Sequence, residues 1–168
     1  MADSAAPVTL LSGDSLARGA QPNLNQALAQ LVPSFTAQTQ GTDMSSFSLS
    51  ARLRGLSPNH TLVMVNGKRR HGSAILQVIP GPFQGSAAPS IDLIPPDAVQ
   101  RIEVLQEGAA AQYGSDAIAG VINIILKSAD TGASMRATAG QFYDGEGETY
   151  SVSGNLGYAL GDNGFFNL

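Results

Sequence analysis

The sequence has no cysteine and little charge, and both absences restrict what the chain can be. Without cysteine it has no disulfide framework, no thiolate metal site and no thiol nucleophile. Charged residues make up 13% of the chain, which is about half the share in an average soluble domain. The net charge is −4, and the longest basic tract is Lys68-Arg69-Arg70. Nucleic-acid-binding proteins normally carry a broad cationic face, so we expect no nucleic acid as a partner.

Long hydrophobic runs and the residue sets of a catalytic centre are also missing. The longest apolar runs, such as Val121–Leu126, fall far short of the ~20 residues of a transmembrane helix. Met1-Ala2-Asp3 lacks the basic start and apolar core of a signal peptide, which indicates an expressed mature part or a missing N-terminus. The histidines are His60 and His71, with no Ser-His-Asp, paired-carboxylate or phosphate-loop spacing around them. We therefore expect no enzyme, no cofactor and no metal site, because two histidines without further ligands bind metal weakly.

Glycine and short alternating patterns are abundant, and together they predict a small α+β domain. The chain has 19 glycines and is 43% hydrophobic, which favours turn-rich β structure over disorder. Residues 1–6 are small and polar, and we expect them to be disordered. The polar stretch 38–45 is expected to be a loop. The ranges expected as strands are 8–11, 47–53, 61–65, 101–105 and 121–126, and those expected as helices or single helical turns are 15–18, 24–32, 95–99 and 109–113.

Glycines and prolines mark the turns between these elements. Asn66-Gly67 is the strongest short turn signal in the chain. The segment 68–91 that follows is rich in glycine and proline, and a loop of this length in a compact domain is usually functional. Gly114 should end the helix at 109–113 with a positive φ. Gly120 should allow a close backbone approach before the last strand.

After Lys127 the pattern changes to that of a membrane-spanning hairpin. Residues 150–160 alternate between apolar and small or polar side chains, with aromatics near each end, as in a transmembrane β-strand of about ten residues. Residues 133–143 form a weaker partner strand, and 165–168 begin a third strand after a tight turn. The pattern alone fits equally well with a soluble hairpin that buries one face.

Three stretches of the chain resemble the plug domain of TonB-dependent outer-membrane receptors. The first joins 6–11 to the helix that ends at Pro33, and the second is Arg54-Gly55-Leu56 followed by TLVMVNGKR at 61–69. The third is the most specific: IPPDAVQRIEVL at 94–105 and AQYGSDAIAGVINI at 111–124 match the family motif nearly position by position. The resemblance covers roughly residues 6–127.

The resemblance implies a fold and a division of the chain. The fold is α+β: a small plug domain with a mixed β-sheet and short helices, followed by an antiparallel hairpin that begins a transmembrane β-barrel. Residues 1–6 would be a disordered start and residues 7–127 the plug. Residues 128–168 would be the first strands of the barrel, truncated after the third strand begins.

The resemblance also implies a function in the outer membrane of a Gram-negative cell. Such a receptor takes up a scarce nutrient: an iron chelate such as a siderophore, haem, cobalamin or a carbohydrate. Its plug, reached through the periplasm, blocks the wide lumen of the barrel and contributes to the ligand site. The implied partners are the transported ligand, the chain's own barrel, and TonB through an N-terminal segment that is not evident here. The alternative is a soluble periplasmic ligand-binding or signalling module derived from a plug.

The resemblance places the loops 57–60 and 68–89 toward the arriving ligand. Arginine and histidine there could bind carboxylate, phosphate or iron-chelate oxygens, and an aromatic ring could stack. The alternative is a solvated loop whose basic residues add solubility or pair with barrel acids. The ligand-binding candidates are Asn59, His60, Arg69, Arg70, His71, Phe83 and Gln84. Because position 106 is Gln where the family usually has an arginine facing acidic groups of the barrel wall, the candidates for the plug–barrel contact are Arg52, Arg54 and Arg101.

Overall fold

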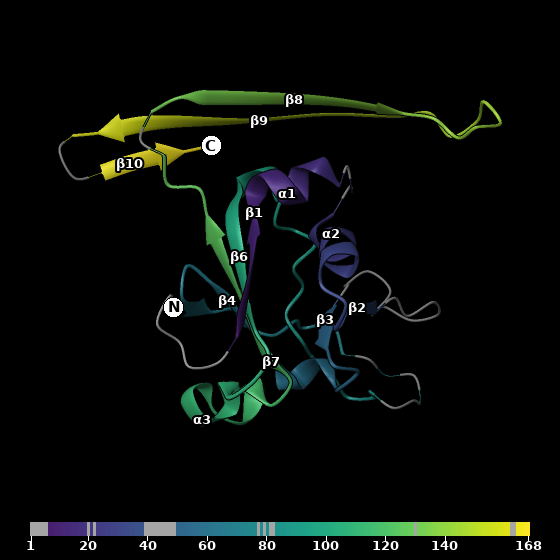
Figure 1. Ribbon diagram of the computed structural model, residues 1–168, viewed down its shortest axis with the longest axis vertical. Coiled ribbons are helices and arrows are strands. Elements are labelled where there is room, and N and C mark those ends of the chain that lie inside the picture. The colour runs from purple at the N-terminus through teal and green to yellow at the C-terminus, as the bar shows by residue number, and fades with distance from the viewer. Residues whose placement is uncertain are drawn as a thin grey trace. The chain divides into compact units, whose positions relative to one another are not determined.

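The computed structural model describes residues 7–19, 21, 23–38, 50–76, 78, 80, 83–129, 131–161 and 164–168. The chain divides into two compact units, Met1–Leu126 and Lys127–Leu168, whose elements are shown in Figure 1. The expected disordered start, residues 1–6, lies outside the described residues. No helix in the described ranges is long and apolar enough to cross a membrane.

A five-stranded mixed sheet forms the centre of the first unit. The parallel pair is β4 with β7, and the remaining neighbours are antiparallel. Strand β7 lies in the middle, and its Val121, Ile122 and Ile124 are fully buried, which explains why it is rich in β-branched residues. The strands, in their order across the sheet, are β1 (Val8–Ser12), β6 (Val99–Leu105), β7 (Gly120–Leu126), β4 (Thr61–Val65) and β5 (Lys68–Arg69).

Short helices and a two-stranded sheet surround this mixed sheet. The antiparallel pair β2 (Phe35–Gln38) and β3 (Ser50–Leu53) lies with α2 to one side of the sheet, and α3 lies at the end where β6 stops and β7 starts (Figure 1). The helices are α1 (Gly13–Arg18), α2 (Leu24–Leu31) and α3 (Ala109–Tyr113), and the single 3-10 turns are η2 (Pro58–His60), η3 (Pro96–Ala98) and η4 (Ser115–Ala117).

Helix α2 shows how local sequence determines these elements. The Asn23 side chain accepts a hydrogen bond from the backbone N–H of Gln26 at 2.9 Å and so caps the helix start. Leu24 and Leu28, one turn apart, are both 0% exposed. The expected loop at 38–45 begins one residue too early, because Gln38 still belongs to β2. Residues 39–49, which include most of that loop and the start of the expected strand 47–53, lie outside the described residues.

The apolar side chains form a core on each face of the mixed sheet. Ile122 and Ile124 belong to the larger core with α1, α2 and the β2–β3 pair. The neighbouring Val121 points the other way and joins a smaller core with Ala109 of α3 and Ala117 of η4. Val8 of β1 packs against this smaller core. The sheet therefore links the N-terminal strand to the α3–η4 segment.

Gly120 makes the expected close approach at the start of β7. Its φ is +140°, and a Cβ atom there would lie 2.6 Å from the Leu105 carbonyl oxygen and 2.9 Å from Cδ1 of Leu53. Glycine is therefore required at this position both for its backbone conformation and for the space.

The second unit is a three-stranded antiparallel sheet with two unlike faces. Its strands are β8 (Ala133–Gly140), β9 (Thr149–Leu160) and β10 (Gly164–Asn167), with β9 in the middle. Strand β8 ends at Gly140, three residues before the expected end, because the chain turns at 143–145. Exposed apolar side chains gather on the first face, which carries Ala133, Met135, Ala137, Ala139, Tyr150, Val152, Leu156, Tyr158, Leu160 and Phe166. The second face carries Ser134, Arg136, Thr138, Ser151, Ser153, Asn155 and Asn167, with Phe165 as its one large apolar side chain.

Candidate functional site

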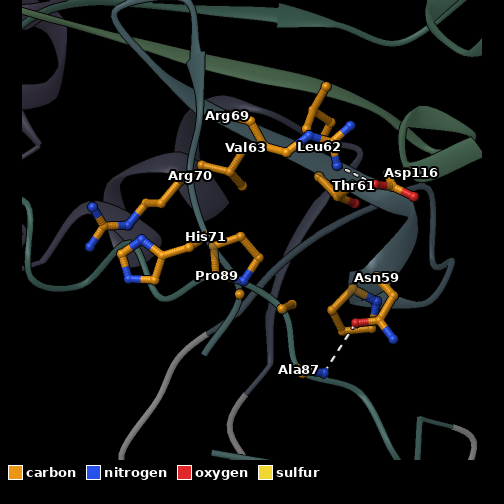
Figure 2. Close-up of a pocket in the computed structure, with 13 residues that line it drawn as sticks. Asn59, Thr61, Leu62, Val63, Arg69, Arg70, His71, Ala87, Pro89 and Asp116 are labelled. Atoms are coloured by element: carbon orange, nitrogen blue, oxygen red, sulfur yellow. Dashed lines mark hydrogen bonds and ion pairs between the residues drawn. The ribbon is translucent and has the colours of Figure 1, made fainter. Parts of the chain in front are cut away.

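A pocket of about 400 Å³ opens beside strand β4 in the first unit (Figure 2). Its floor is apolar and rigid, because Leu62 and Val63 are central, buried strand residues. The polar groups come from the chain on either side of β4 and from η4. The lining residues are Pro58, Asn59, Thr61, Leu62, Val63, Arg69, Arg70, His71, Gly72, Ala87, Ala88, Pro89 and Asp116.

The 3-10 turn η2 places Asn59 at the pocket. Ser57 begins the turn, and its Oγ accepts from the Asn59 N–H at 3.4 Å. The Asn59 Oδ1 then accepts from the Ala87 N–H at 3.1 Å, drawn as a dashed line in Figure 2. His60 is held by its carbonyl, which accepts from the Ala119 N–H at 2.9 Å. The turn is thus fixed both to the long loop and to the chain before β7.

The Asn66-Gly67 turn brings the two arginines back beside β4. Asn66 has φ +50° and Gly67 has φ +75°, the left-handed pair of a tight hairpin turn. The Asn66 Oδ1 accepts from the Leu126 N–H at 2.9 Å, and the Gly67 N–H donates to Oδ1 of Asn123 at 3.0 Å. These two bonds tie the turn to β7 and so fix the position of β5, which carries Arg69.

Asn123 belongs to a buried polar group behind the turn. Its Nδ2 donates to Oε2 of Glu103 at 3.0 Å, and Arg101 donates from Nε to Oε1 of the same carboxylate at 3.0 Å. Glu103 and Asn123 are 8% and 5% exposed, so these partners are what makes their burial tolerable. This chain of bonds runs from Arg101 to the Gly67 N–H.

Arg69 pairs with Asp116 at one side of the pocket. The Arg69 Nη1 donates to Oδ2 of Asp116, so β5 is joined to η4. The hydrogen bond and the charge of Arg69 hold the pKa of the Asp116 carboxyl below its usual value, with smaller contributions from the Ser115 hydroxyl and the charge of His60. Both side chains are about half exposed (54% and 50%), so solvent screens the pair.

Arg70 has a different environment from Arg69. Its backbone N–H donates to the Val63 carbonyl at 2.9 Å, and its Nε donates to the Ser90 carbonyl at 3.0 Å. No described residue accepts from its two terminal nitrogens. In Figure 2 the Arg70 and His71 side chains extend to one side, whereas the Arg69–Asp116 pair lies on the other.

The two ends of the long loop are joined where it leaves the sheet. The Ser73 N–H donates to the carbonyls of Ala87 at 3.0 Å and Ala88 at 3.3 Å. A Cβ on Gly72 would lie 2.5 Å from the Ala87 oxygen, so the two segments touch. We call Gly72–Ser73 with Ala87–Ala88 the neck of the loop. Beyond the neck, the buried Asn25 of α2 donates to Oδ1 of Asp92 and ties the end of the loop to the helix.

Four of the seven residues expected to bind ligand line the pocket: Asn59, Arg69, Arg70 and His71. His60 lies in the adjacent turn and is not part of the lining. Phe83 and Gln84 lie elsewhere: the Phe83 ring is covered by the Arg52 guanidinium, 4.5 Å from its centroid, and Gln84 donates to the Val78 carbonyl at 3.2 Å. The pocket acid, Asp116, was missed, although parallel pairing of 61–65 with 120–126 would have placed it there.

The three arginines expected at the barrel wall differ in their surroundings. Arg52 stacks on Phe83, and Arg101 pairs with Glu103. Arg54 is exposed and has an unusual φ of +57°. Its Nη1 donates to the carbonyl of Gln106 at 3.3 Å. Among the described residues, Arg54 alone of the three contacts neither a carboxylate nor an aromatic ring.

Comparison with known proteins gives consistent matches. The profile of the family described as TonB-dependent Receptor Plug Domain matches residues 1–121. The chain is 39% identical over 113 residues to the vitamin B12 transporter BtuB of Photobacterium profundum, a match covering 67% of this chain and 16% of that protein. The chain therefore spans about a sixth of the length of this curated relative.

Solved structures match almost the whole chain. A double mutant of the ferric enterobactin receptor PfeA from Pseudomonas aeruginosa matches 97% of the chain and 24% of its own, with TM-score 0.69 and 26% identity. The siderophore receptor PirA from the same organism matches 98% and 27%, with TM-score 0.63 and 25% identity. The expected fold, a small mixed-sheet domain with short helices followed by antiparallel strands that begin a barrel, is confirmed.

Proposed function

This chain belongs to the TonB-dependent receptor plug family, and we propose that it is the gate of an outer-membrane receptor that takes up a scarce nutrient. Members of this family are outer-membrane transporters and receptors rather than enzymes. The proposed division is a plug at 7–127 and the first barrel strands at 128–168. The separation of the chain into compact units at Leu126 and Lys127 supports this division.

The pocket beside β4 is the observation that carries the proposed ligand site. It gathers Asn59, Arg69, Arg70 and His71 around the buried strand β4, and a rigid base is what a binding site requires to hold its polar groups in place. We assign these four residues to direct ligand contact. His60 supports the turn that carries Asn59, whereas Phe83 and Gln84 belong to the loop that frames the site. The ligand is one of an iron chelate, haem, cobalamin or a carbohydrate, and the names of the relatives favour the iron chelate or cobalamin.

The second unit supports the receptor over a soluble periplasmic module. Its first face exposes large apolar side chains such as Tyr150 at 73% and Met135 at 78%. A soluble module would have to leave this surface in water, whereas a barrel strand turns it toward lipid and places aromatics at the interfaces. We assign this face to lipid and the face with Arg136 and Asn155 to the barrel lumen.

Two further contacts are proposed, one with the barrel wall and one with TonB. Arg54 is the proposed partner of an acidic group on the barrel wall, because Arg52 and Arg101 are already engaged within the plug. The proposed route to TonB is the segment before β1, since β1 packs through Val8 against the core beneath α3 and η4.

Ligand binding to the complete receptor tests this proposal. The purified receptor would be titrated separately with cobalamin, ferric enterobactin, haemin and maltose, and isothermal titration calorimetry would measure binding of each. We expect one of these to bind, and Asn59→Ala to weaken that binding by about tenfold, as for loss of one buried polar contact. Gln84→Ala is the matched control, because Gln84 is an exposed loop amide outside the pocket. Equal binding by the Asn59 variant and the wild type would rule out the pocket as the ligand site.

A further inference from the structure

We propose that the pocket selects an anionic ligand, with the Arg70 guanidinium as its principal cation and the Asn59 amide as a neutral donor. The inference rests on the proposed function of the pocket as the ligand site and narrows its chemistry. It distinguishes a ligand that presents carboxylate, phosphate or similar anionic oxygens from a neutral sugar or a cation.

The charges around the pocket leave one unpaired arginine. The charged lining residues are Arg69, Arg70 and Asp116, with His71 as a further titratable group. Asp116 is paired with Arg69, and no other carboxylate belongs to the lining. The pair cancels, so the permanent charge that an entering ligand meets is that of Arg70. His60, beside the pocket, adds no negative charge.

Arg70 is held in position before any ligand arrives. Its backbone and its Nε are bonded to the Val63 and Ser90 carbonyls, and the side chain is half-buried. These bonds fix the plane of the guanidinium and leave the two terminal nitrogens without a partner among the described residues. A planar pair of N–H donors matches the two oxygens of a carboxylate or phosphate, and prior ordering reduces the entropy lost on binding.

Two side-chain acceptors at the pocket are already occupied. The Asn59 Oδ1 accepts from Ala87, and the Thr61 Oγ1 accepts from the Leu53 N–H at 3.3 Å. Because the Asn59 oxygen is bound to Ala87, its Nδ2 is left as the free end of the amide and can only donate.

Three backbone carbonyls of the lining are occupied as well. The Ala87 and Ala88 oxygens accept from Ser73, and the Val63 oxygen accepts from Arg70. A sugar hydroxyl needs acceptors as well as donors, whereas an anionic oxygen needs donors alone. The Arg70 terminal nitrogens and the Asn59 Nδ2 are donors, so they add to the charge in favouring an anion.

The test is a titration of the full chain in detergent. Binding is monitored through the NMR signals of the Asn59 amide and the Arg70 side chain. The anionic probes are citrate and inorganic phosphate, the neutral probe is maltose, and the cationic probe is spermidine. We expect both anions to shift these signals, with citrate the stronger, and salt to weaken the effect. Maltose and spermidine should leave the signals unchanged.

Variants of Arg70 show whether the anion is bound by the paired N–H donors of this guanidinium or only attracted by positive charge in general. Arg70→Gln should weaken citrate binding about tenfold or more, as for a charged hydrogen bond, and Arg70→Lys should lie between it and the wild type. Arg18→Gln removes an exposed arginine of α1 outside the pocket lining, so it should bind citrate normally. If Arg70→Gln fails to fold, Arg70→Lys and the salt dependence decide the question. The inference is overturned if citrate shifts neither signal, if maltose or spermidine shifts them more, or if Arg18→Gln weakens binding as much as Arg70→Gln.

The complete receptor distinguishes this inference from the proposed function. If Asn59→Ala weakens nutrient binding and Arg70→Gln does not, the pocket is the ligand site and the anionic selection is wrong. If neither variant weakens nutrient binding, both the site and the inference are wrong. If both weaken it together with loss of citrate binding to the chain, both stand.

Discussion

Replacing Gly120 with alanine should damage the centre of the mixed sheet. Gly120 starts β7, the strand that pairs with both β4 and β6, and β4 forms the floor of the pocket. Alanine adds one methyl group and no charge, so its effect comes from backbone conformation and space alone. The change therefore tests whether the close packing at this point supports the pocket.

Two separate costs contribute to the expected loss of stability. The φ of +140° is rarely adopted by a residue with a Cβ, which costs about 1–3 kcal/mol. The added Cβ would lie 2.6 Å from the Leu105 oxygen and 3.3 Å from the Gln106 Cα, and relieving such overpacking costs about 1–3 kcal/mol. Together they lower the free energy of unfolding by about 2–6 kcal/mol, a large part of the ~5–15 kcal/mol that stabilises a typical protein.

Hydrogen exchange of the β4, β6 and β7 amides in the full chain would measure this loss. Gly114→Ala is the matched control, because its φ is +89° but a Cβ there would meet nothing within 4 Å. It should show the conformational cost alone, about 1–3 kcal/mol. Gly19→Ala should change stability little, because its φ lies outside the left-handed region and the atoms nearest to a Cβ there, Oε1 of Gln30 and the Leu16 carbonyl oxygen, are both at 3.4 Å, an ordinary contact distance. Equal losses for Gly120→Ala and Gly114→Ala would show that the contact with Leu105 is unimportant.

Two further predictions concern the polar groups around the pocket. Asn123→Ala should lower the free energy of unfolding by about 1–3 kcal/mol, because it removes the partner of the Gly67 N–H and of Oε2 of the buried Glu103, whose Oε1 still accepts from Arg101. Urea unfolding would measure this loss, and a stability equal to that of the wild type would contradict it. The lowered pKa of Asp116 means that its pairing with Arg69 stabilises the fold above the ordinary carboxyl pKa and is lost as the pH falls through the lowered value. Asp116→Asn should therefore flatten the acid side of the stability profile, and a carboxyl carbon titrating at or above the usual range by NMR would disprove the effect.

Local patterns in the sequence predicted most elements, and contacts distant in sequence explain what they missed. The Asn23 cap and the Asn66-Gly67 turn depend on a few neighbouring residues, so they could be predicted directly. Strand β2 is four residues long and is defined by its pairing with β3, which no local pattern reveals. The Asp116 position likewise depends on which strands lie side by side.

The surroundings of the basic residues in the pocket likewise depend on contacts that are distant in sequence. Arg69 and Arg70 were expected to bind ligand because they are charged loop residues, and both line the pocket. The sequence could not show that Arg69 is neutralised by Asp116 while Arg70 is left available, because this depends on three-dimensional pairing. The contact between the Phe83 ring and the Arg52 guanidinium of β3 depends on the same three-dimensional arrangement.

The neck of the long loop makes the segment between Ser73 and Ala87 an exchangeable module. The bonds from Ser73 to Ala87 and Ala88 hold the two ends together whatever the intervening sequence is. Lengthening a loop whose ends are already joined costs little, about 0.6 kcal/mol for each doubling. Insertions or replacements within 74–86 should therefore leave the sheet intact. Because Asn59, Arg69, Arg70 and His71 lie outside this segment, it can change in length or sequence while the pocket keeps these four side chains.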